Sequence, residues 1–151
     1  MDVPSIRLSD GSYELSWLFW ALFDDLNFFD PGRELTVSDT SAVIRLSHKY
    51  GLDKLLHQAL RSIEEPLTSE PSDWSSINDH LRRSMAPIFP SDGPILASLG
   101  HLTGRASLLP MAYYLCCQLG VHELVYGVKE MGGSVSCPKP TLLDVYVDSE
   151  S

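Results

Sequence analysis

The segment AVIRLSHKYGLDKLLHQAL, residues 42–60, decides the fold because it encodes two helices joined by a sharp corner. Val43, Leu46 and Tyr50 recur at the spacing of one helix face, and a glycine follows them directly. Glycine readily adopts the left-handed conformation that ends many helices, so we expect the first helix to stop at Tyr50. The second helix carries one apolar stripe made of Leu52, Leu55, Leu56, Ala59, Leu60 and Ile63. The segment therefore predicts an αα-hairpin whose apolar stripes face inward.

Both outer ends of this hairpin carry boundary signals. Residues 36–39, Thr-Val-Ser-Asp, resemble a capping box, in which a hydroxyl and an acidic side chain satisfy the free N–H groups of a helix start. We therefore expect the first helix to begin just after Thr36. Pro66 lacks a backbone N–H, so we expect it to close the second helix.

The residues before the hairpin predict a strand and a strongly apolar helix. Residues 4–10 alternate Ile6 and Leu8 with polar neighbours, which favours a short half-buried strand. Residues 13–26 follow the helical period, with one stripe made of Leu15, Leu18, Phe19, Leu22 and Phe23 and an opposite side made of Trp17, Trp20 and Ala21. Because this helix is apolar nearly all round, we expect later helices, a second chain or upstream sequence to cover it.

The residues after the hairpin predict further helices and then a tail. Residues 74–85 place apolar side chains on one side of a helix. Another helix starts near Pro94 and is interrupted at Gly104, and a third occupies residues 108–120, followed by a short helical turn over residues 121–126. The remainder is rich in Gly, Ser, Pro and acidic residues, so we expect a loose tail.

The composition argues against binding to nucleic acid or to an anionic membrane surface. The net charge is −9, the sequence pI is about 4.8, and the 11 Lys and Arg residues are scattered. Phosphate recognition needs clustered cations. The chain also has no apolar run of the roughly 18 residues that a membrane span needs, no secretion signal at its start and an odd number of cysteines. We expect a cytoplasmic or nuclear protein.

The nucleophilic and titratable residues form no recognisable catalytic, cofactor or metal motif. No two of the five histidines share the spacing of a helical zinc site, and the two histidines of the hairpin fall on its polar faces. Cys116 and Cys117 are adjacent in an apolar run, which is typical of buried small side chains. We therefore predict no catalytic, cofactor-binding or metal-binding residue. The alternative is a small enzyme that uses Cys116 or Cys117 with His101 or His122.

The order of these elements resembles the BTB/POZ domain family, in particular its fungal members of unassigned function. Residues 4–29, PSIRLSDGSYELSWLFWALFDDLNFF, look like the late strand and following helix of that fold. Residues 36–65, TVSDTSAVIRLSHKYGLDKLLHQALRSIEE, resemble the helix pair that comes next, including its Tyr-Gly corner. Residues 107–119, SLLPMAYYLCCQL, are similar to a helix that follows the BTB core in the fungal group.

The resemblance implies a mainly α fold with an α+β remnant. This is the C-terminal half of a BTB/POZ-like fold, in which one short strand is followed by a helical bundle extension. It divides the chain into a partial BTB/POZ-like region at residues 4–66, a helical extension at residues 67–127 and a flexible tail at residues 128–151. A complete BTB domain carries a strand hairpin and two helices ahead of the strand expected here.

The resemblance also implies a non-enzymatic protein–protein interaction module, an adaptor or scaffold without cofactors. Its partner is expected to be another BTB protein or a cullin-type scaffold. We do not expect a homo-oligomer, because much of the family's dimer interface would precede residue 4. From the apolar helix we predict Trp17, Phe19 and Trp20 as partner-binding residues. The alternative is a truncated fragment without independent function.

Overall fold

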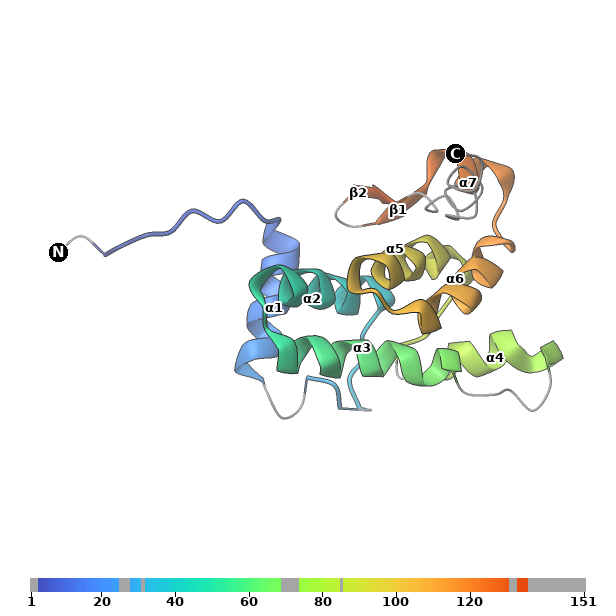
Figure 1. Cartoon of the computed structure of the whole chain (residues 1–151), viewed down its shortest axis with the longest axis horizontal. Coiled ribbons are helices and arrows are strands. Elements are labelled where there is room, and N and C mark those ends of the chain that lie inside the picture. Colours follow the sequence, from blue (N-terminus) through green and yellow to red (C-terminus); the bar gives the residue numbers. More distant parts are fainter. Residues whose placement is uncertain are drawn as a thin grey trace, which may run out of the picture.

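The fold was described from a computed structural model, which describes residues 3–24, 28–30, 32–68, 74–84, 86–130 and 133–135. It is mainly helical, as the sequence predicts (Figure 1). The α-helices are α1 (Ser12–Phe23), α2 (Val37–Tyr50), α3 (Asp53–Thr68), α4 (Ile77–Arg82), α5 (Gly93–Thr103), α6 (Leu109–Cys116) and α7 (Val121–Tyr126). Short 3-10 turns cover Trp74–Ser76, Pro90–Asp92 and Ala106–Leu108, and the strands are β1 (Val128–Glu130) and β2 (Gly133–Val135).

The αα-hairpin formed by α2 and α3 is confirmed, together with its boundary signals. The Thr36 hydroxyl accepts a hydrogen bond from the Asp39 N–H at 3.2 Å, and the Asp39 carboxylate accepts one from the Thr36 N–H at 2.9 Å. At the corner, Gly51 has φ 67°, the left-handed conformation that an L side chain rarely adopts. The Leu52 N–H donates to the Ser47 carbonyl at 2.9 Å, which closes the end of α2.

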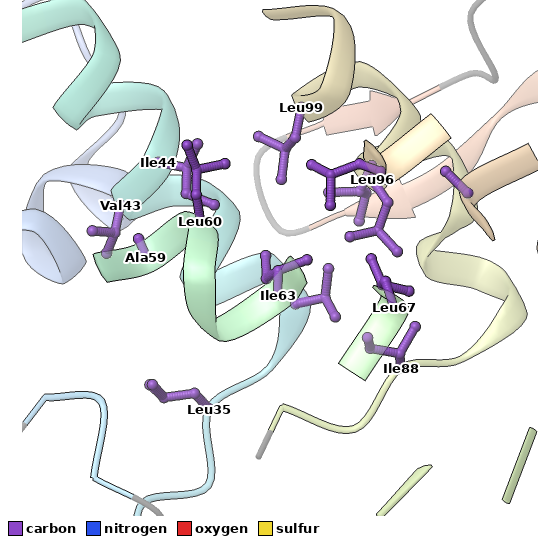
Figure 2. Packing of buried hydrophobic residues seen from close by; sticks show 14 of the residues in the cluster. Leu35, Val43, Ile44, Ala59, Leu60, Ile63, Leu67, Ile88, Leu96 and Leu99 are labelled. Atoms are coloured by element: carbon purple, nitrogen blue, oxygen red, sulfur yellow. The ribbon is translucent and has the colours of Figure 1, made fainter. Parts of the chain in front are cut away.

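Helix α2 lies at the centre of the molecule and packs against α1, α3 and α5. Nine of its 14 residues are buried, including Ser41, Ala42 and Ser47. These small side chains let the neighbouring helices approach closely. In Figure 2 the side chains of Val43 and Ile44 lie near those of Ala59 and Leu60 from α3. The hairpin is therefore the framework on which the other helices assemble.

Helices α5 and α6 pack through glycines. A Cβ atom added at Gly93 would lie 2.8 Å from the Cys116 nitrogen, and one added at Gly100 would lie 2.8 Å from a methyl group of Leu109. Gly104 ends α5 with φ 68°, as the sequence predicts. Helix α6, however, ends at Cys116 and not at Gly120, which instead precedes α7.

The prediction that Pro66 closes the second helix is wrong, because α3 continues through it to Thr68. Proline removes only one intrahelical hydrogen bond, and here this loss falls in the last turn. Burial of Leu67 against the core favours the extra turn, and the Thr68 hydroxyl donates to the Glu64 carbonyl at 2.8 Å. Packing thus overrides the local signal.

The predicted strand at residues 4–10 is also wrong. Residues 3–9 carry no regular structure and are exposed, and they run away from the helices (Figure 1). Among the described residues the strands lie instead near the other end, where β1 and β2 pair antiparallel with Val128 opposite Val135. This hairpin lies within residues 128–151, where the sequence predicts a loose tail, so that prediction fails for its first residues. Residues 136–151 lie outside the described part.

Candidate functional site

The outer face of α1 exposes a contiguous group of large apolar side chains. Its inner face packs on α2, with Leu18 and Ala21 buried. The side chains on the outer face remain exposed by 46% at Phe19, 48% at Trp20, 43% at Leu22 and 88% at Phe23. Phe19 and Phe23 are four residues apart and so lie one above the other along the helix. We call these four residues the α1 outer face.

The sequence located this helix correctly but did not indicate which positions of it are exposed. Exposed Phe19 and Phe23 fall on one predicted stripe with buried Leu18, and exposed Trp20 falls on the opposite side with buried Ala21. Because both sides of α1 are apolar, helical periodicity does not indicate which one faces the core.

The three predicted partner-binding residues divide into two groups. Phe19 and Trp20 belong to the α1 outer face. Trp17 is only partly exposed and packs against the core, with its ring stacked on that of Trp20 at 5.3 Å and edge-on to Phe28 at 6.1 Å. Phe28 is 2% exposed. Trp17 therefore supports the outer face from behind.

Arg33 completes this face from a different segment. Its guanidinium carbon lies 4.5 Å from the centre of the Trp20 ring, and its Nη1 lies 2.8 Å from an Asp24 carboxylate oxygen. The cation–π contact holds the loop after α1 against the helix end. Nothing in the local sequence of Arg33 predicts this contact.

A small hollow borders the α1 outer face on the side of α3. Its volume is about 300 Å³, and it is lined by Ala21, Leu22, Leu52, Asp53, Lys54, Leu55 and Gln58. Apolar side chains from two helices thus meet at its edge. A hollow of this size accommodates one apolar side chain from a binding partner, next to the exposed rings.

The segment before α1 is tied to the end of α2 by Asp10. Its carboxylate accepts hydrogen bonds from the Lys49 ammonium and the Tyr50 hydroxyl. The hydrogen bond from Lys49, followed by that from Tyr50, holds the pKa of Asp10 below its ordinary value. The same carboxylate raises the pKa of Lys49 and of Tyr50. Beyond this point Ile6 and Leu8 are exposed.

The cysteines and histidines of the enzymatic alternative lie in different surroundings. Cys116 is buried at the contact of α5 and α6, and Cys117 is exposed. His101 Nε2 lies 2.8 Å from the Tyr113 hydroxyl, and the ring of His122 lies 4.7 Å from that of Tyr126.

No group of three or more metal-ligating side chains is found among the described residues. Within the same residues, no helix is long and apolar enough to cross a membrane. Comparison of the sequence with models of protein families and with curated proteins, and of the fold with solved structures, finds no match.

Proposed function

We propose that this chain is a non-enzymatic protein–protein interaction module of BTB/POZ type that acts as an adaptor or scaffold. It binds its partner by burying the α1 outer face. The partner is another BTB protein or a cullin-type scaffold in the cytoplasm or nucleus.

The main support is the exposure of four large apolar side chains, Phe19, Trp20, Leu22 and Phe23, on one helix. Single exposed apolar residues are ordinary, but a contiguous group marks an interaction site. Aromatic residues supply much of the binding energy at protein interfaces. Trp17 stacks on Trp20 and itself packs edge-on to the buried Phe28, so the Trp20 ring is held in place from behind.

The charged residues on the rest of the surface provide the electrostatic contribution to partner binding. The chain carries a net charge of −9, which disfavours acidic partners and speeds association with basic ones. The apolar face supplies affinity, whereas the charge biases partner choice and association rate.

The test is affinity capture from the native lysate with a paired control. Phe19→Asp/Phe23→Asp places two carboxylates on the α1 outer face, and the control, His57→Asp/Gln118→Asp, places two on exposed positions outside α1. We expect one reproducible partner that is lost with the first variant and kept with the second. The captured protein is then purified, and its direct binding to both variants is measured.

Two results would contradict the proposal. One is a partner that binds the Phe19→Asp/Phe23→Asp variant as tightly as the unmodified chain. The other is an eluate that contains only chaperones and proteases, together with a non-cooperative thermal transition of the isolated chain. That second pair of results would favour a truncated fragment without independent function.

A further inference from the structure

The short helix α7 turns an apolar stripe toward solvent. Val121, Leu124 and Val125 stand at positions i, i+3 and i+4 and so share one side of the helix. All three are exposed, Val121 by 79% and Val125 by 63%. A helix with such a stripe ordinarily buries it against another element. Within the described part of the chain, no residue buries the stripe of α7.

This end of the chain needs further burial to be stable. Helix α7 has six residues, and isolated helices shorter than about 12 residues are marginal in water. The hairpin that follows has only three residues in each strand, and a two-stranded hairpin alone is also marginal. A segment outside the described residues that covers the stripe would stabilise both elements.

The register of the hairpin brings the chain back to α7. Val135 of β2 is paired with Val128 of β1, which lies two residues after the end of α7 at Tyr126 (Figure 1). Paired strands lie about 5 Å apart. Residues 136–151 follow Val135 directly, so this segment begins beside the end of α7.

Residues 136–151 contain one strongly apolar stretch within reach of the stripe. Residues 141–147 read Thr-Leu-Leu-Asp-Val-Tyr-Val, and β-branched and aromatic side chains favour an extended conformation. The spacer before them, residues 136–140, spans about 17 Å when extended. Helix α7 is about 9 Å long. The spacer is therefore long enough to place the apolar stretch anywhere along the stripe.

We propose that residues 141–147 of this chain pack in extended form across the apolar stripe of α7. Successive side chains of an extended segment point to opposite sides. The side that carries Leu143, Val145 and Val147 is entirely apolar and faces the helix, whereas the other side carries Asp144 and faces water. A short tether gives the segment an effective concentration in the millimolar range, which favours it over a separate protein as the occupant.

The first test measures amide hydrogen exchange in the full chain by NMR. Leu143→Asp/Val147→Asp charges the side of the segment that faces α7, and Leu142→Asp/Tyr146→Asp makes the same change at the same spacing on the other side. We expect the first variant to speed exchange of the hydrogen-bonded amides of residues 124–126 by at least about tenfold, and the control to change it by less than about twofold. The buried amides of α2 serve as an internal reference, because neither variant should alter the core.

The second test charges the helix and observes the segment. Val121→Asp/Val125→Asp disrupts the stripe, and the control His122→Asp/Tyr126→Asp makes the same substitution at the same spacing on another side of α7. We expect backbone NMR order parameters of residues 142–147 near about 0.8 in the unmodified chain and in the control, and below about 0.6 in the stripe variant.

Three results would overturn the proposal. One is equal exchange of the α7 amides in the two variants of residues 142–147, and another is an order parameter below about 0.6 for those residues in the unmodified chain. The third is protection of α7 that rises with protein concentration, which would assign the cover to a second copy of the chain. Failure of the α1 variants in the capture experiment leaves these measurements unaffected, because the two surfaces use different residues.

Discussion

Tyr13 of α1 and Asp39 of α2, 26 residues apart in sequence, are joined by a side-chain hydrogen bond in which the Tyr13 hydroxyl donates to Asp39. The second carboxylate oxygen of Asp39 accepts from the Thr36 N–H at 2.9 Å. Asp39 is almost completely buried. One carboxylate therefore both caps α2 and fixes α1, which carries the candidate surface, against it.

Replacing this carboxylate should loosen both contacts at once. We expect Asp39→Ala to lower the free energy of unfolding by about 1–3 kcal/mol, since it removes both a helix cap and the hydrogen bond from the Tyr13 hydroxyl. Tyr13→Phe should cost less, about 0.5–1.5 kcal/mol. Urea denaturation measures both values, and Asp30→Ala, at an exposed position, serves as the control. A loss at Asp39 no larger than at Asp30 would contradict the dual role.

The close contact of α5 with α6 predicts intolerance to a single methyl group. Gly93→Ala places a Cβ within 3.0 Å of Cys116 Sγ and 2.8 Å of its backbone nitrogen. Because backbone atoms do not move aside easily, we expect a loss of about 1–3 kcal/mol in denaturation experiments. Gly32→Ala is the matched control, since nothing lies within 4 Å of its added Cβ. Equal stability of the two variants would rule out the tight packing.

The anchoring of the N-terminal segment by Asp10 should depend on pH at both ends of the range. The pKa of Asp10 is lowered in the fold, so its contribution is present above the unfolded pKa and is lost as the pH falls through the folded value. The pKa of Lys49 is raised, so its contribution is lost as the pH rises through the folded value.

We therefore expect the segment to be held between the ordinary pKa values of 3.8 for Asp10 and 10.5 for Lys49, and released only below the first or above the second. NMR shifts of the backbone amides of residues 7–11 report this release. In Asp10→Asn the same amides should show the released shifts at neutral pH. A pH-independent spectrum in the unmodified chain would show that Asp10 does not anchor the segment.

Removing the Trp17 ring should lower stability more than removing the Trp20 ring. Trp17 packs between Tyr13, Trp20 and the core, so Trp17→Ala should lower stability by about 2–4 kcal/mol. Trp20→Ala removes an exposed ring and its contact with Arg33, which should cost about 1 kcal/mol or less. Thermal unfolding of both variants measures the two losses of stability. If the order is reversed, Trp17 is not the supporting residue.

Much of the helical framework could be predicted from local chemistry. The capping box at Thr36 and the left-handed Gly51 each depend only on neighbouring residues, so the sequence predicts both correctly. Phe28 lies after the helix predicted for residues 13–26 and yet is nearly completely buried, because it packs against Trp17 in a way that helical periodicity does not describe. Likewise, burial of Leu67 in the core favours the continuation of α3 past Pro66, which the local sequence does not predict.

The candidate surface was less predictable than the framework. The sequence identified Phe19 and Trp20, but it did not identify Leu22 or Phe23 as exposed, because both sides of α1 are apolar. Arg33 reaches Trp20 only through the path of the loop after α1.

The adjacent cysteines give a last prediction, which also tests the enzymatic alternative. Successive helical residues point about 100° apart, and Cys117 is accordingly exposed whereas Cys116 is buried. A maleimide probe should therefore label Cys117 within minutes in the native state and Cys116 only after denaturation, as peptide mass spectrometry can assign. A catalytic cysteine activated by a histidine would instead react far faster than a free thiol, with a rate that falls on His101→Ala or His122→Ala. If Cys117 reacts at the ordinary rate in both variants, neither histidine activates it, and exposure alone accounts for its reactivity.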